Sequence, residues 1–385
     1  MTTETLQILT HIPNSRARQA ELQYRLTQLN RPQRVQMLCL ALDDPYPPLR
    51  HDVAEALQIE LGRGERAVEA LDAEVTRLLE AVVSDQVPDA SALTTLMVPI
   101  ELVPRGSMRA RMTACVALEA SPYPERTADL LLPLLRAENE DLRYQALIAT
   151  HRLVPDSPRL HEAVLAGLED PDPEIVVVAT QIAVLHGWAD LLPQFLHARA
   201  RLRGEDRVQI TFSVGELIDN SSLTAAALPE EARQDIIAEC HDALDHEPHT
   251  AAAIRTLANL EAQEATDKLA KMAKGWFVHP ILKVEAAAAL VDLGDLRGQE
   301  YLEKALSSRR KDARGYALRI AGDRKLPQYL DHLIEVARSD DYHADTATLA
   351  LADFGGDRAR SVLAELAASH GDAEVRELAR TALQE

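Results

Sequence analysis

The sequence contains few cysteines and few aromatic residues, and each scarcity narrows the possible folds. Its 385 residues include only three cysteines, Cys39, Cys115 and Cys240, which lie far apart. This spacing provides neither a disulfide framework nor a Cys-x-x-Cys metal motif. Aromatic residues make up 4% of the chain, whereas hydrophobic residues make up 46%. Aliphatic and alanine side chains must therefore fill the core, which favours close-packed helices over a sheet sandwich.

Long apolar runs and positive charge are also scarce. No apolar run reaches the roughly 18 residues that a membrane span needs, and the N-terminus lacks a basic-then-apolar signal pattern. We therefore expect a cytoplasmic protein without a membrane segment. The chain has 41 Lys and Arg against 61 Asp and Glu, a net charge of −20. This balance disfavours nucleic acids and anionic membranes as partners, because cationic side chains drive binding to phosphates.

A short motif recurs through the chain. It consists of an apolar residue, often a cation, and then an alanine-rich stretch with apolar residues at helical spacing. Clear copies are LRYQALIAT from Leu142, LKVEAAAAL from Leu282 and VRELARTAL from Val375. Most copies are 31 to 34 residues apart, and two gaps of 59 and 74 residues are near multiples of that period. We expect these gaps to contain degenerate copies near Leu78–Val82 and from Thr250.

Each motif follows a second amphipathic segment, such as TADLLLPLLRA at 127–137. The repeating unit is therefore a helix A, a short polar turn, a helix B and a connector. The connectors include Gly294–Asp295 and Gly322–Asp323, where glycine is expected to end helix B in the left-handed conformation and aspartate to cap the next helix A. A single helix pair cannot bury its apolar face, whereas stacked pairs can.

We therefore predict an all-α fold, a right-handed α-solenoid of about ten helix pairs. It is expected to form one array over residues 1–385. The repeat interval is irregular at 215–250, so a break in the array would fall there and separate residues 1–214 from 251–385.

Residues 290–319 and 353–383 resemble HEAT repeats, in particular the short HEAT-like variety named after phycobilisome lyases. That variety runs roughly LGDxRAVPxLxxLLxDxDPxVRxxAAxAL, and LVDLGDLRGQEYLEKALSSRRKDARGYALR at 290–319 follows it in order. The resemblance covers most of residues 33–385 and implies the same solenoid. Deoxyhypusine hydroxylases, another HEAT-like family, bind iron through His-Glu pairs on helix B, and this sequence has no such pairs at the matching positions.

The resemblance also implies a structural use for the cations of the motif. Acidic residues precede several of these cations in the A–B turn, as Asp141 precedes Arg143 and Asp312 precedes Arg314. In HEAT-like repeats such pairs form a ladder between the turn and helix B. Because the cation recurs once per repeat, it indicates a structural feature and not a single catalytic site. The cations are Arg50, Arg109, Arg143, Lys283, Arg314 and Arg376.

Lysine is confined to one part of the chain. All seven lysines lie within residues 268–325, where 13 cations and seven acids give a local charge of +6 and leave −26 for the remainder. Such a basic block on an acidic solenoid is predicted to bind an acidic protein segment or an anion.

The segment KGWFVHP at 274–280 lies inside this block and, by register, in an A–B turn. It places large apolar residues where other turns are polar. If they are exposed they form an interaction hot spot, and if they turn inward they fill a gap in the core. Successive A–B turns stack along one edge, so we predict a partner-binding patch composed of Lys271, Lys274, Trp276, Phe277, Arg309, Arg310 and Lys311.

The leading functional hypothesis is a non-enzymatic scaffold or adaptor that binds another protein or an extended peptide segment. We found no catalytic motif, metal constellation or cofactor motif, and we expect neither a cofactor nor a metal. Two alternatives rest on resemblance alone. One is a tetrapyrrole (bilin) lyase or lyase-like subunit, which needs a reactive thiol or base near a cleft. The other is an alkylpurine DNA glycosylase-like protein, which requires a basic groove and is opposed by the net charge.

Overall fold

The computed structural model describes residues 12–62, 70–87, 93, 96, 103–104, 106–246, 248–339 and 341–384. Within these residues it contains 21 α-helices and no strand, as predicted. The chain divides into two compact units, the first formed by Met1–His186 and Pro193–Asp206 and the second by Gly187–Leu192 and Arg207–Glu385. The boundaries of this division, after His186 and after Asp206, come before the irregular segment 215–250. The break expected within that segment stays a prediction.

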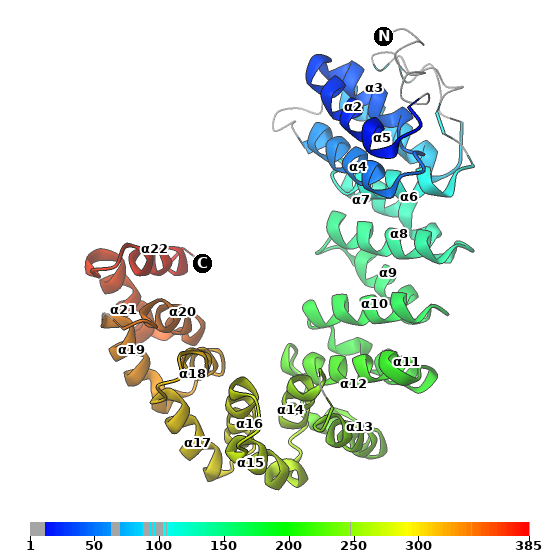
Figure 1. Ribbon diagram of the computed structural model, residues 1–385. Coiled ribbons are helices and arrows are strands. Elements are labelled where there is room, and N and C mark those ends of the chain that lie inside the picture. Colours follow the sequence, from blue (N-terminus) through cyan, green and yellow to red (C-terminus); the bar gives the residue numbers. More distant parts are fainter. Residues whose placement is uncertain are drawn as a thin grey trace. The chain divides into compact units, whose positions relative to one another are not determined.

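The first unit is a stack of antiparallel helix pairs (Figure 1). Helices α4, α6, α8 and α10 pack on one another in succession and form one layer, and the first helix of each pair covers them. After α2 (Ser15–Gln28) the pairs are α3 (Arg31–Leu40) with α4 (Pro47–Gly62), α5 (Ala70–Val83) with α6 (Met108–Leu118), α7 (Pro124–Leu131) and the 3₁₀ helix η3 (Leu132–Arg136) with α8 (Glu140–Leu153), and α9 (Pro158–Leu168) with α10 (Pro173–Leu185).

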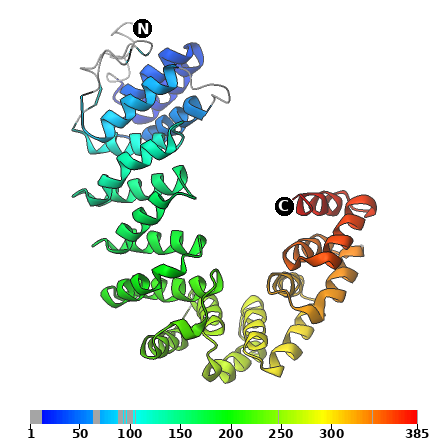
Figure 2. The same cartoon turned by 180° about the vertical axis from the view of Figure 1, so that it is seen from behind.

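Helices α11 (Leu192–Arg201) and α12 (Gly204–Asp219) follow at the division between the units. The second unit continues the same pattern (Figure 2), with α14, α16, α18, α20 and α22 packed in succession. Its pairs are α13 (Glu230–Ala243) with α14 (Thr250–Asn259), α15 (Thr266–Lys274) with α16 (Pro280–Asp292), α17 (Leu296–Leu306) with α18 (Lys311–Asp323), α19 (Leu330–Arg338) with α20 (Ala344–Phe354), and α21 (Gly356–Ser369) with α22 (Ala373–Ala382).

The prediction of about ten helix pairs is thus confirmed. The expected degenerate copy from Thr250 is α14, the second helix of its pair. The other expected copy, Leu78–Val82, lies in α5, which packs on α6 as the first helix of a pair. The apolar signal there was read correctly as a helix but was assigned to the wrong position in the repeat.

Local sequence explains the ends and the packing of these helices. Asp172 caps α10 by accepting a hydrogen bond from the Glu174 N–H at 2.9 Å, and Pro173 occupies the first turn, where no intrahelical donor is needed. The four alanines Ala286–Ala289 of α16 are all buried. Small side chains on several faces of one helix let neighbours approach from several sides, which explains how a chain with few aromatics fills its core.

Two glycines of the connectors behave differently. Gly294 has φ +74° and ends α16, and Asp295 then caps α17, as predicted. The prediction for Gly322 was wrong, because Gly322 lies inside α18. A Cβ atom at Gly322 would stand 2.3 Å from the Ala350 carbonyl oxygen of α20, so the glycine permits close helix packing. Lys325, with φ +48°, takes the left-handed conformation after this helix.

Candidate binding surface

The predicted patch lies on the A–B turns of the second unit. Residues 275–279 join α15 to α16, residues 307–310 join α17 to α18, and residues 339–343 join α19 to α20. Because α16, α18 and α20 pack in succession, these turns follow one another along the same edge of the unit (Figure 2). The register expected from the sequence is therefore correct.

The residues of the aromatic turn 275–279 differ in exposure. A Cβ atom at Gly275 would lie 2.8 Å from a methyl group of Val278, so the half-buried Val278 lies against the end of α15. Trp276 and Phe277 are 94% and 104% exposed. Of the two alternatives drawn from the sequence, exposure holds for these two side chains. Burying one large apolar side chain is worth about 1.5–3 kcal/mol, so this turn provides unused binding energy.

A groove of about 630 Å³, which we call the aromatic groove, runs between turns 275–279 and 307–310. Its apolar lining comes from α15, α16, α17, α18 and the aromatic turn and includes Trp276 and Tyr301. Its charged lining is mainly basic, with four cations and one acid: Lys274, Lys283, Lys304, Arg310 and Glu300. The Lys304 ammonium group is paired with Glu300 at 2.5 Å, which leaves the other three cations facing the groove.

A second groove of about 440 Å³, the basic groove, lies between turns 307–310 and 339–343. Arg309 and Lys311 line it, whereas the residue between them, Arg310, lines the aromatic groove. Turn 307–310 is therefore the wall between the two grooves. The Lys311 ammonium nitrogen lies 3.5 Å from the centre of the exposed Tyr342 ring, a cation–π contact.

The structure thus brings most of the predicted patch together. Lys274, Trp276 and Arg310 share one groove, and Arg309 and Lys311 share the next. Lys271 and Phe277 are exposed and line neither groove. Sequence reasoning missed Tyr301, Lys304 and Tyr342, which belong to the same surface. Tyr301 and Lys304 lie on helix A, and their position beside the turn depends on how neighbouring pairs stack.

The ion-pair ladder has a different register from the one expected. Three arginines, each the fourth residue of its helix, pair with the acid that stands three residues before the helix two positions further along the chain, and not with an acid of their own turn. The Arg143 Nε–Asp170 Oδ2 distance is 2.8 Å, and the Arg314 Nη1–Asp341 Oδ2 distance is 2.8 Å. Arg18 and Asp44 pair in the same way at 3.0 Å. Arg143 and Arg314 therefore tie one repeat to the next, whereas Arg50 and Arg376 donate hydrogen bonds to carbonyl oxygens of their own turns.

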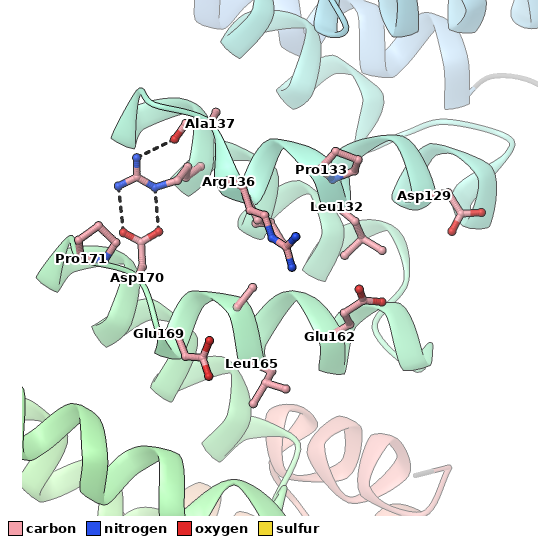
Figure 3. Close-up of a pocket in the computed structure, with 13 residues that line it drawn as sticks. Asp129, Leu132, Pro133, Arg136, Ala137, Glu162, Leu165, Glu169, Asp170 and Pro171 are labelled. Atoms are coloured by element: carbon pink, nitrogen blue, oxygen red, sulfur yellow. Dashed lines mark hydrogen bonds and ion pairs between the residues drawn. The ribbon is translucent and has the colours of Figure 1, made fainter.

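We call each ion pair between successive repeats a rung of the ladder. The Arg143–Asp170 rung lies in the first unit, at the end of a groove between η3 and α9 (Figure 3). The Arg143 guanidinium group donates two hydrogen bonds to the Asp170 carboxylate, at 2.8 and 2.9 Å, and one to the Ala137 carbonyl oxygen at 2.9 Å. Both charged side chains are buried. Leu132 and Pro133 line the groove from the side of η3, and Glu162, Leu165 and Glu169 line it from the side of α9.

The rung at the aromatic groove lacks its acid. Lys283 is the fourth residue of α16, and Ser308 stands three residues before α18. Ser308 accepts a hydrogen bond from the backbone N–H two residues later, as Asp170 and Asp341 do, so it occupies the equivalent position. A serine hydroxyl group carries no charge and cannot neutralise the lysine. Within the part of the chain that the structure describes, Lys283 forms no ion pair.

The cations of the predicted patch are also outside ion pairs within the described residues, although Lys304 and, less strongly, Lys274 lower the pKa of the Glu300 carboxyl group. Among the described residues, no ion pair involves the side chains of Lys271, Lys274, Arg309, Arg310 and Lys311. Arg310 is the N-cap residue of α18, the position that Asp172 occupies in α10. Asp170 and Asp172 of turn 169–172 therefore correspond to Ser308 and Arg310 of turn 307–310.

The chemistry of the remaining polar groups is limited. Burial raises the pKa of the Cys39 and Cys115 thiols to about 12, and Cys240 is also buried. Among the described residues, no three His, Cys, Asp or Glu side chains are grouped so that they could hold a metal ion. None of the described helices is long and apolar enough to span a membrane.

The fold defines the class of protein: an α-solenoid built from consecutive antiparallel helix pairs. Residues 299–384 match the family of HEAT repeats, so the chain contains HEAT repeats over its last pairs. No curated protein matches the chain in sequence.

Solved structures of karyopherins are similar in fold. Kap121p bound to the extreme C-terminus of the protein phosphatase Cdc14p is 13% identical, with a TM-score of 0.50 over 99% of this chain and 45% of that chain. Kap121p bound to the SUMO protease Ulp1p is 14% identical, with a TM-score of 0.39 over 91% of this chain and 44% of that chain. The chain thus spans less than half the length of these karyopherins.

Proposed function

We propose that this chain is a non-enzymatic scaffold or adaptor that binds another protein, through an extended segment, at the two grooves of the second unit. The observation that carries the proposal is the incomplete rung: Lys283 and Arg310 line one groove next to the exposed Trp276, and the carboxylate of that groove, Glu300, is paired with Lys304. An apolar anchor beside unsatisfied cations is the composition of a protein-binding hot spot.

The surrounding charge supports this location. Outside residues 268–325 the chain carries −26, whereas that segment carries +6. A partner segment with negative charge is repelled by most of the surface and attracted to the grooves, which raises its association rate and selects its binding position. The fold is also suitable, since Kap121p, which shares it, is bound to the extreme C-terminus of Cdc14p.

The two alternatives have weaker support. The lyase alternative needs a reactive thiol or a base near a cleft, and its first option is weakened because all three cysteines of this chain are buried. A DNA glycosylase needs a cationic surface long enough to follow the nucleic acid backbone, whereas the basic grooves here lie within the span of three successive turns.

The test is a comparative capture from cells of the native host. The intact chain is compared with Trp276→Ala/Phe277→Ala and with Leu296→Ala, a control that removes another exposed apolar side chain, at the start of α17. We expect a protein that the intact chain and the control retain in stoichiometric amount and the double variant loses. With that protein purified, the double variant should weaken Kd about 30-fold, equivalent to about 2 kcal/mol.

Thermal unfolding separates binding from folding. Both variants should melt within about 1 °C of the intact chain, because exposed side chains contribute little to stability. A large loss of stability with unchanged partner binding would instead place the two aromatics in the core. Catalytic turnover by the purified chain would overturn the proposal as a whole.

A further inference from the structure

We propose that the partner is an acidic extended segment, and that one of its carboxylates binds beside Lys283 and Arg310, where Ser308 stands at the position that Asp170 and Asp341 occupy in the complete rungs. This inference rests on the proposed function and specifies the chemistry of the partner. The partner would thereby make the contact that Asp170 and Asp341 make within the chain.

The geometry of the complete rungs shows what the incomplete one lacks. In each complete rung, a carboxylate three residues before the helix both accepts a hydrogen bond from the turn and neutralises a cation of the previous repeat. Ser308 keeps the first interaction, with its hydroxyl oxygen 3.1 Å from the Arg310 nitrogen, but cannot make the second. The side chains of Lys283, Ser308 and Arg310 all line the aromatic groove, so an incoming carboxylate reaches the vacant position from solvent.

The neighbouring groups define the rest of the segment. Trp276 and Tyr301 line the same groove and can pack on an aromatic or large apolar side chain next to the bound carboxylate. Arg309 and Lys311, on the other side of turn 307–310, present charge to a second acidic residue in the basic groove. Adjacent repeats are separated by about 10 Å at helix-packing distance, so the two charged positions correspond to about three residues of extended chain.

Carboxylates fit this surface better than a phosphate group. A phosphate site needs several donors that converge on one point, and a bidentate arginine serves best. Here Arg314, the arginine of the adjacent complete rung, is already bound to Asp341 and to the Leu306 carbonyl oxygen. The free cations are instead divided between two grooves, and Lys311 is held over Tyr342. A row of single charges matches this spacing.

The experiment measures binding of a fluorescein-labelled peptide, Glu-Glu-Glu-Phe-Glu-Glu-Glu, to the full chain by fluorescence anisotropy at low salt. Because the phenylalanine is central, the peptide can bind in either direction. We expect saturable binding that weakens as salt increases. Replacing all glutamates by glutamine should weaken Kd at least about tenfold, as expected when several exposed ion pairs are lost.

The decisive variants change one position. Ser308→Asp supplies the missing carboxylate within the chain, and Ser308→Asn is its matched control, with the same shape and the same capacity to accept the turn hydrogen bond but no charge. We expect Ser308→Asp to weaken peptide binding about tenfold relative to Ser308→Asn and to raise Tm by about 2 °C relative to it. Arg360→Asp, which changes charge at an exposed position on α21 outside both grooves, should leave peptide affinity within about twofold.

Several results would overturn the inference. One is equal peptide affinity in Ser308→Asp and Ser308→Asn. Another is tighter binding of a lysine peptide or of a single-stranded oligonucleotide, and a third is a phosphoserine peptide that binds more than tenfold tighter than the glutamate peptide. If the acidic peptide does not bind while a captured protein still depends on Trp276 and Phe277, the inference fails and the proposed function stands.

Discussion

Turns 169–172 and 307–310 occupy the same place in two repeats and use it differently. In the first, Asp170 is buried and neutralises Arg143, and Asp172 caps the following helix. In the second, the equivalent residues are Ser308 and Arg310, and the cation of the previous repeat, Lys283, is left without an acid. In both turns a side chain, that of Asp170 or Ser308, accepts a hydrogen bond from the backbone N–H two residues later. The charges of the two turns differ.

This difference separates charge that stabilises the fold from charge that is available to a partner. An arginine paired inside a buried rung has no capacity left for a ligand, and removing its acid leaves a charge in a desolvated site. Lysine and arginine side chains facing an open groove have lost little hydration, so the fold tolerates them.

The buried rung should be the most sensitive. Asp170→Ala leaves the buried Arg143 guanidinium group without its carboxylate, and we expect a loss of about 3 kcal/mol in the free energy of unfolding. Urea unfolding followed by far-UV circular dichroism measures it. Asp170→Asn, which keeps an acceptor for the turn N–H, should lose nearly as much. If the alanine variant instead loses less than about 1 kcal/mol, the ladder does not contribute to stability as described.

The rung between Arg314 and Asp341 should show an intermediate effect. Both side chains are partly exposed, at 23% and 26%, so solvent screens their attraction. Asp341→Ala also removes the acceptor of the His343 backbone N–H, and we expect a loss of about 1–2 kcal/mol. Asp341→Asn restores that acceptor and should recover about half of the loss in the same urea titration. A loss as large as that of Asp170→Ala would contradict the dependence on burial.

The smallest effect on the free energy of unfolding is expected at Arg310, where a substitution should stabilise the fold. Arginine is a poor residue at the cap position of α18, and Arg310→Asn supplies a side-chain oxygen that can accept a helix N–H. We expect a gain of about 0.5–1 kcal/mol in stability, together with weaker binding of the acidic peptide. Thermal unfolding and the anisotropy titration test the two parts. A variant that is stabilised and binds the peptide as tightly as the intact chain would show that Arg310 does not belong to the site.

Local patterns in the sequence predict the helix pairs, their turns and the place of the aromatic segment in one of those turns. Helical spacing of Ala and Leu, prolines in first turns and capping aspartates are local signals, and they act within one repeat. They were enough to place Trp276 and Arg310 on successive turns of one edge. They also misled at Gly322, where a local signal for a helix end is in fact a contact between helices.

Stacking of the repeats sets which charges are paired. The sequence shows an acid before several of the cations, which suggested pairs within a repeat. Arg143 and Arg314 instead pair with an acid in the turn of the following repeat. The exposure of Trp276 and Phe277 is likewise a property of the folded turn. Contacts between repeats are set by packing, and packing cannot be read from the order of residues within one repeat.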